Sequence, residues 1–243
     1  MPDAPPPRAH YTRLARERGL VSGGGKPLSF VAPDPGLPDY ELRIFERGEV
    51  PTREGDWHDA CNAEAWLAFP LAKAAANRLH VAAIRESQPS RDGGKPPRGA
   101  LRDRLTQFDE CGVVVAGLRM DLWEAFCAHR WREVFVDHRA EVVATSRFLI
   151  FGHGSRDALR APFFGLCGKA LRLDAPAGDT SAIDAELARR LARADFCTTY
   201  LQPLPLLGVP GLCADNEAPA YYDDIRQFRP PRTMRAGSPP GSR

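Results

Sequence analysis

The segment from Asp56 to His80 reads DWHDACNAEAWLAFPLAKAAANRLH and is the most informative part of the chain. At about 100° per residue, six of its residues fall on a strip roughly 60° wide along one helix face. These six residues, the polar strip, are Asp59, Asn62, Trp66, Lys73, Asn77 and His80. Polar groups are costly to bury unless they are paired or bind a ligand. The spacing therefore predicts a polar face turned toward the body of the protein or toward a cleft in it.

Pro70 interrupts this helical pattern. Proline has no backbone N–H, and inside a helix its ring clashes with the carbonyl four residues earlier, here that of Trp66. The pattern predicts two helices, Trp57–Ala68 and Pro70–Arg85, with the proline at the opening position of the second. If the two helices are antiparallel, the halves of the polar strip can face one another across the turn.

The polar strip has two interpretations. In the structural one it is a buried hydrogen-bond network, in which Asp56 caps a helix and Asp59 and Asn62 hold neighbouring loops. In the functional one it faces a small polar ligand. The candidate ligand-binding residues are then Asn62, Trp66, Lys73 and Asn77.

The rest of the chain predicts further helices and a few strands. Two more helices are expected at Arg119–Val136 and Ser181–Ala194, the second with capping-box-like spacing at its start. The strand candidates are Tyr40–Phe45, Gln107–Phe108 with Val113–Ala116, and Phe148–Phe151. Leu201–Gly211 contains three prolines, which favour an extended segment on the core. The prediction is an α+β fold, a mainly helical single domain with short strands or hairpins.

Both ends of the chain differ in composition from its centre. Residues 1–27 are basic and rich in proline and glycine, so we expect a flexible arm with a short helix at Tyr11–Arg18. A single globular domain is predicted for residues 28–230, with a flexible loop at 85–99 and a disordered tail at 231–243. The first 26 residues carry five basic and two acidic side chains, so the centre is mildly acidic despite a net charge of +2.

Composition excludes several classes of protein. There is no run of 18 apolar residues, so no membrane span is predicted, and residues 1–26 lack the apolar core of a secretory signal, so we expect a cytoplasmic protein. The six cysteines include no CxxC pair and no zinc-finger spacing, and reduced thiols are expected. The centre shows no periodic basic face, and specific nucleic-acid binding is not expected.

Further candidate residues lie outside the polar strip. His58 precedes it by one residue. Asp109 and Glu110 fall in the turn of a predicted hairpin, Phe108–Val113, where carboxylates are also common for turn reasons. His153 lies between two glycines, directly after a predicted strand, which suits a site and equally suits an ordinary turn.

Several strings together resemble one bacterial family. They are Tyr40–Phe45, Val50–Arg53, the motif from Trp57 to Asn77, Phe108–Glu110, Phe151–His153 and Leu207–Gly211. They resemble the proteins grouped as domain of unknown function 3025, over nearly all of residues 30–230. Cys61 and Leu212 depart from the expected pattern, and both changes concern packing. The resemblance implies no activity, because none is assigned to the family.

Two classes of function remain open. One is a hydrolase-like enzyme that uses acid/base residues or a divalent metal ion. Its candidate catalytic residues are His58, Asp59, His80, Asp109, Glu110 and His153. The other is a non-catalytic ligand-binding or scaffold protein whose polar strip is a structural network. No phosphate-binding glycine loop, nucleophile elbow or dinucleotide fingerprint is present.

Overall fold

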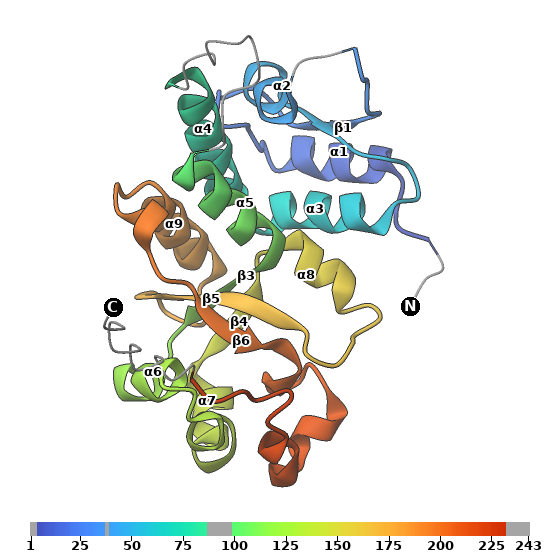
Figure 1. Ribbon diagram of the computed structural model, residues 1–243. Helices are drawn as coiled ribbons and strands as arrows, with labels where there is room; N and C mark the ends of the chain where they lie inside the picture. The colour runs from blue at the N-terminus through green and yellow to red at the C-terminus, as the bar shows by residue number, and fades with distance from the viewer. Residues whose placement is uncertain (1–3, 37–38, 87–98, 232–243) are drawn as a thin grey trace, which may run out of the picture.

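A four-stranded sheet crosses the middle of the molecule (Figure 1). The computed structural model describes residues 4–36, 39–86 and 99–231. The strands of the sheet are β3 (Gly112–Ala116), β4 (Arg147–Ile150), β5 (Cys167–Leu173) and β6 (Gln202–Pro205). Their order is β4-β3-β5-β6; β3 is parallel to β5, and the other pairs are antiparallel. A smaller parallel pair joins β1 (Ser29–Val31) to β2 (Glu49–Pro51).

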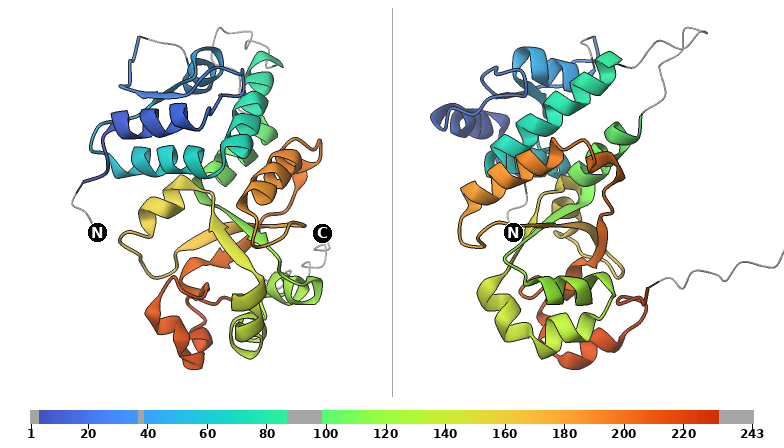
Figure 2. Two further views of the ribbon diagram at one scale, coloured as in Figure 1. Left: turned by 180° about the vertical axis from the view of Figure 1, so that it is seen from behind. Right: turned by 90° about the vertical axis from the view of Figure 1, so that its left-hand side faces the viewer.

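Helices lie on both sides of the four-stranded sheet (Figures 1 and 2). On one side lie α1 (Arg8–Glu17), α2 (Tyr40–Arg47), α3 (Trp57–Ala68), α4 (Pro70–Glu86), α5 (Ala100–Cys111), α8 (His153–Ala158) and α9 (Thr180–Leu191). On the other lie α6 (Met120–Cys127), the π-helix η1 (Glu133–Asp137) and α7 (Arg139–Thr145). Short 3₁₀ turns occur at Phe196–Thr198, Leu206–Gly208, Ala214–Glu217 and Pro219–Asp223. No helix in the described part of the chain has the length and apolarity to cross a membrane.

Strand β3 separates two hydrophobic cores. All five of its residues are buried, and successive side chains of a strand point to opposite faces. Val113 and Val115 enter one core with α6 and the π-helix, whereas Val114 and Ala116 enter the other with α4, α5 and α9. A third core lies among α1, α2 and α3. The predicted fold class, a mainly helical α+β domain with few strands, is confirmed.

The helices around Pro70 form as predicted. Helix α3 ends at Ala68, Phe69 leaves helical geometry, and α4 begins at Pro70. The first turn of α4 is capped from a distant helix: the Asp184 carboxylate accepts hydrogen bonds from the N–H groups of Leu71 and Ala72, each 2.9 Å long. Asp184, a residue of α9, therefore caps the first turn of α4, whereas the N-terminus of α9 itself is capped by Asp179. The capping box that the spacing of Ser181 and Asp184 predicted at the start of this helix is therefore not formed.

Two predicted strands are helices. Residues Tyr40–Phe45 belong to α2, because Asp39 caps the N–H of Glu41 and Gly48 ends the helix in the left-handed region with φ 71°. The predicted hairpin at Phe108–Val113 was also wrong. Leu105 and Phe108 fall on one helix face and are buried, so α5 continues through Asp109 and Glu110 to Cys111.

The predicted helix Arg119–Val136 is divided. Helix α6 ends at Cys127, and His129 follows with a φ of 57°, which a continuous helix does not allow. The π-helix then begins at Glu133.

The predicted strand at Phe148–Phe151 corresponds to β4 within one or two residues. The segment Leu201–Gly211 was predicted to be extended. Gln202–Pro205 is extended as the edge strand β6, where proline is tolerated, but Leu206–Gly208 forms a 3₁₀ turn.

Much of the predicted N-terminal arm is part of the folded domain. Helix α1 lies beside α3 in both views (Figures 1 and 2) and buries Tyr11 and Ala15, one helical turn apart, in the third core. The Thr12 hydroxyl accepts a hydrogen bond of 2.9 Å from the N–H of Phe30. Most of the predicted loop, residues 87–98, and the end of the chain, residues 232–243, lie outside the described residues.

Candidate functional site

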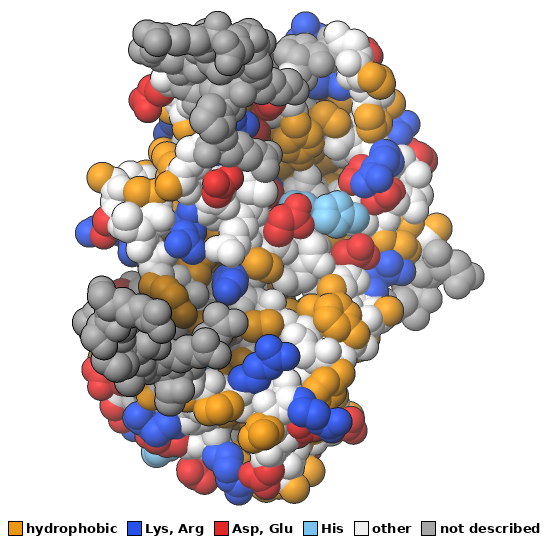
Figure 3. Space-filling model, in the orientation of Figure 1, with side chains coloured by type: hydrophobic (Ala, Val, Ile, Leu, Met, Phe, Trp, Pro, Cys, Tyr) orange, Lys and Arg blue, Asp and Glu red, His pale blue; other side chains and the backbone are white. Residues whose placement is uncertain are grey.

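A polar cavity of about 370 Å³ opens between α2, α3, α5 and α8. Its lining residues are Asp39, Tyr40, Glu41, Pro51, Arg53, His58, Asp59, Asn62, His80, Arg102, Thr106, Asp109, Glu110 and His153. Figure 3 shows histidine side chains flanked by acidic ones near the middle of this face. A shallower hollow of about 640 Å³ follows α1, but its charged residues include the surface ion pairs Arg8–Glu54 and Arg13–Glu17. Chemistry-bearing residues converge on the smaller cavity.

All six candidate catalytic residues line this cavity, and the candidate ligand-binding residues divide. Asn62 reaches it from α3. Trp66, Lys73 and Asn77 lie behind its wall, around a void of about 10 Å³. The three are buried, with 2%, 4% and 1% of their surface exposed. The inner part of the polar strip therefore supports the cavity and does not line it.

Lys73 joins the two halves of the polar strip across the break at Pro70. Its ammonium donates hydrogen bonds to Asn62 Oδ1 at 2.8 Å and to Asp109 Oδ1 at 2.5 Å. The amide of Asn62 in turn donates to the Tyr40 hydroxyl at 2.8 Å. This chain of polar contacts ties α2, α3, α4 and α5 together, as the structural interpretation of the polar strip requires.

Asp59 anchors the segment before α3. Its carboxylate accepts two hydrogen bonds from the Arg53 guanidinium, at 2.9 and 2.7 Å, and one from the Arg53 N–H at 2.7 Å. Burial raises the pKa of Asp59, but the hydrogen bonds from Arg53 lower it by a larger amount. The pKa of Asp59 therefore lies below its usual value. Asp59 is therefore an ionised, fully engaged carboxylate.

Glu41 is an acidic group of the cavity that sequence reasoning missed. The Asn77 amide donates to Glu41 Oε2 at 2.7 Å and to the Glu41 carbonyl at 2.9 Å, and His80 Nε2 lies 3.9 Å from Glu41 Oε1. Burial is the main cause that raises the pKa of Glu41 to about 7. The signal was present in the sequence: Asp39 before Tyr40-Glu41 is a typical helix start, which would have placed Glu41 in a first turn.

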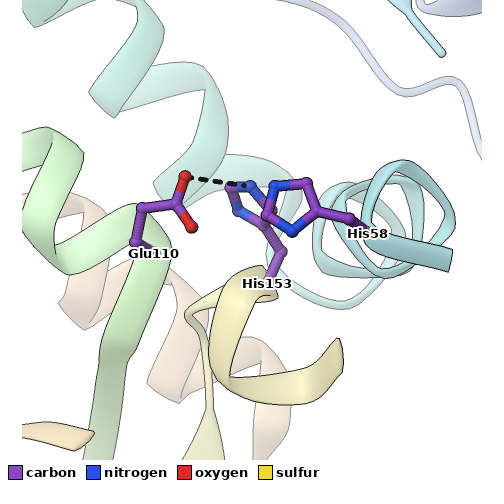
Figure 4. A group of neighbouring side chains, drawn as sticks. All are labelled: His58, Glu110 and His153. Atoms are coloured by element: carbon purple, nitrogen blue, oxygen red, sulfur yellow. Dashed lines mark ion pairs between the residues drawn. The ribbon is translucent and has the colours of Figure 1, made fainter. Parts of the chain in front are cut away.

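His58, Glu110 and His153 form a cluster on the cavity wall (Figure 4). The His58 and His153 rings have centroids 4.5 Å apart, and His153 Nε2 lies 3.5 Å from Glu110 Oε1. One ligand atom from each of the three residues lies within 4.8 Å of the others. His58 comes from the first turn of α3, Glu110 from the last turn of α5, and His153 from the start of α8.

Two glycines allow this close approach. A Cβ at Gly154 would lie 2.5 Å from Glu110 Oε2, and a Cβ at Gly152 would lie 2.5 Å from the backbone nitrogen of Cys111. Real Cβ atoms do not approach other atoms so closely. The glycines that flank His153 therefore let the start of α8 pack directly against the end of α5.

Asp109 lies beside His153 at an ion-pair distance, without a hydrogen bond between the two side chains. Its Oδ2 lies 3.6 Å from His153 Nδ1, while its Oδ1 binds Lys73. Burial raises the pKa of Asp109, but Lys73 and His153 lower it more, and the carboxylate stays ionised. Burial is also the main cause that lowers the pKa of His153, although Asp109 opposes it. A neutral imidazole backed by a carboxylate is the usual state of a metal-binding histidine.

The cluster has the composition of a site for a divalent metal ion. Two imidazoles and one carboxylate suit zinc and related ions. Two ligand atoms about 2.1 Å from a tetrahedral ion are roughly 3.4 Å apart, close to the 3.5 Å between His153 Nε2 and Glu110 Oε1. Because Glu110 has 47% of its side chain exposed, the cluster is open to the cavity.

The chain matches the family model described as "Protein of unknown function (DUF3025)" over residues 28–232, a span that includes His58, Glu110 and His153. No curated protein and no solved structure matches the chain. The resemblance drawn from the sequence motifs is thus confirmed, and the chain belongs to the DUF3025 family.

Proposed function

We propose that the cavity is a hydrolytic active site in which His58, Glu110 and His153 bind a divalent metal ion that activates water. One observation carries the proposal: two imidazoles and a carboxylate from three separate helices place their ligand atoms within 4.8 Å of one another on the wall of a cavity. Three protein ligands leave a coordination position for water or substrate, which is typical of catalytic zinc sites. A bound metal ion lowers the pKa of that water toward neutrality.

The remaining polar residues have supporting roles in this proposal. Asp109 orients His153, and Lys73 keeps Asp109 ionised and in place. Glu41 and His80, which also line the cavity, are the proton-transfer groups, because the pKa of about 7 of Glu41 is matched to neutral pH. Asp59 is assigned a structural role, since Arg53 already engages both of its oxygens.

A second candidate function is non-catalytic binding of a small polar ligand. The observation that favours it is that three residues of the polar strip, Asn62, Lys73 and Asn77, make hydrogen bonds within the protein. Such a network builds a rigid pocket without supplying a reactive group. The two functions differ in whether the metal-loaded protein turns over a substrate.

Metal binding is the decisive measurement. The protein is stripped with a chelator, and zinc and manganese binding are then measured by titration calorimetry and elemental analysis. We expect one ion per chain in the wild type and at least a tenfold weaker affinity in His58→Ala and His153→Ala. His138→Ala is the matched control, because that ring is 40% exposed and remote from the cavity lining.

A panel of ester, amide and phosphoester substrates is then tested with the metal-loaded protein. The proposed metal site would be contradicted if wild type bound neither ion at micromolar concentration. It would also be contradicted if the two histidine variants bound metal like wild type. Stoichiometric metal without hydrolysis of any substrate class would favour the binding function instead.

A further inference from the structure

One face of α5 forms a wall of the cavity. Arg102, Thr106, Asp109 and Glu110 all line it, and their spacing of four, three and one residues keeps them on one side of a helix. Arg102 lies in the first turns of α5 and Glu110 at its end. The eight residues between them correspond to roughly 12 Å along the helix axis. The cavity therefore has a cationic end and a metal-binding end.

Arg102 differs from the other cations beside the cavity. Arg53 is engaged by Asp56 and Asp59, at 3.2 and 2.7 Å, and Lys73 by Asp109 at 2.5 Å. Within residues 4–36, 39–86 and 99–231, Arg102 has no carboxylate partner, and its Nε is buried with no hydrogen-bond acceptor. A buried donor of a charged group normally has an acceptor, so the missing acceptor indicates a ligand.

We propose that Arg102 binds an anionic group, phosphate or carboxylate, of a small substrate whose reacting bond lies at the His58–Glu110–His153 cluster. The substrate class rests on the proposed function, whereas anion binding at Arg102 stands without it. A guanidinium presents parallel N–H donors that match both anions. Asp39, Glu41 and Glu110 line the same cavity, and they repel an anion from other positions along its wall.

The size of the cavity limits the substrate. About 370 Å³ lies at the lower end of the volumes that hold small molecules. The substrate is therefore a single small anionic molecule that spans the distance from Arg102 to Glu110. The metal end selects the bond to be broken, and the guanidinium fixes the orientation of the molecule.

Two probes test the cationic end, phenyl phosphate and benzoate, each titrated calorimetrically into zinc-loaded and zinc-free protein. We expect at least one probe to bind, and its affinity to fall at least tenfold in Arg102→Gln in both forms of the protein. Arg102→Lys keeps the positive charge but lacks the parallel N–H donors of the guanidinium, so its loss of probe affinity should be smaller. Arg104→Gln is the matched control, since Arg104 lies on the same helix, outside the cavity lining, and bonds to Gln107.

The outcomes separate the two proposals. Preference for phenyl phosphate assigns a phosphate group, and preference for benzoate assigns a carboxylate. Two results would overturn the assignment of Arg102. One is that Arg102→Gln binds zinc and both probes like wild type; the other is that wild type binds neither probe at millimolar concentration. Loss of probe binding in Arg102→Gln with no zinc bound by any variant would support Arg102 and contradict the metal site.

Discussion

The rings of His58 and His153 lie edge to face, with centroids 4.5 Å apart and an interplanar angle of 65°, although they belong to α3 and α8. This pair exists because α8 starts with a glycine-flanked histidine that packs against α3 and the end of α5. Each histidine alone would be an ordinary helix-start residue. Together with Glu110 they form the only group of three potential metal ligands found in the described ranges.

Gly154→Ala should damage the cluster without unfolding the protein. The new Cβ would lie 2.5 Å from Glu110 Oε2 and must displace that half-exposed carboxylate. We expect zinc affinity to fall about tenfold to a hundredfold, in the range seen when groups around a metal site are disturbed. Calorimetric titration with zinc measures this change. Gly178→Ala is the control, because its Cβ would meet open space, and equal losses in both variants would refute the steric argument.

Lys73→Met should destabilise the fold. The substitution leaves the Asp109 carboxylate, whose side chain is 23% exposed, without its cation. Removing one partner of a fully buried pair costs about 3–5 kcal/mol, and we expect a loss below that range. Urea denaturation at pH 7 measures the loss. The double variant Lys73→Met with Asp109→Asn should recover part of it, because no charge is then left unpaired. A double variant whose loss equals the sum of the losses of Lys73→Met and Asp109→Asn would mean that the pair is not coupled.

Glu41→Gln should change how stability depends on pH. Folding raises the pKa of Glu41 from 4.5 to about 7, so the folded protein binds this proton more tightly than the unfolded chain does. The stabilisation is fully present below pH 4.5 and is lost as the pH rises through 7. Relative to wild type, Glu41→Gln should therefore gain stability between pH 5 and 8, by up to about 3 kcal/mol.

Denaturation midpoints at pH 5, 6, 7 and 8 measure this gain. Glu46→Gln is the control on the same helix, because the Glu46 side chain is half exposed and pairs with Arg85 at 3.3 Å. The stability of Glu46→Gln relative to wild type should not increase between pH 5 and 8. A flat difference between Glu41→Gln and wild type across this range would contradict the raised pKa.

Asp59→Asn should cost stability and leave metal binding intact. The variant loses the paired contact with Arg53, and we expect a loss of about 1 kcal/mol at pH 7, because the Arg53 side chain is 58% exposed to solvent. The folded-state pKa of Asp59 is lowered, so this contribution is present above about pH 4 and is lost as the pH falls further. Parallel unfolding and zinc titrations test it. Unchanged stability with lost zinc affinity would instead place Asp59 in the site.

Much of the local structure could be predicted from the sequence. The proline at position 70 predicted the break between α3 and α4, since a missing N–H has the same effect in any context. The spacing of Asn62, Lys73 and Asn77 predicted an inward polar face, because burying unpaired polar groups is costly. Strand β4 and the extended segment at β6 followed from composition alone.

Other elements depended on tertiary contacts. The segments at α2 and α5 were predicted as strand and hairpin, because short apolar runs have no decisive period. Only packing shows that Leu105 and Phe108 share a buried helix face, which moves Asp109 and Glu110 from a turn to the end of a helix. Glu41 lines the cavity because its segment, which was predicted as a strand, is helix α2.

The helical pair, its polar strip and the residue types available for chemistry can be read from local sterics and periodicity. The tertiary structure sets which of those residues meet. It placed Asn77 and Lys73 behind the wall, and His58, Glu110 and His153 together on the cavity wall. The physical reason is that helix packing sets the distances between segments far apart in the chain, and glycine contacts such as Gly154 against Glu110 are not encoded in any local pattern.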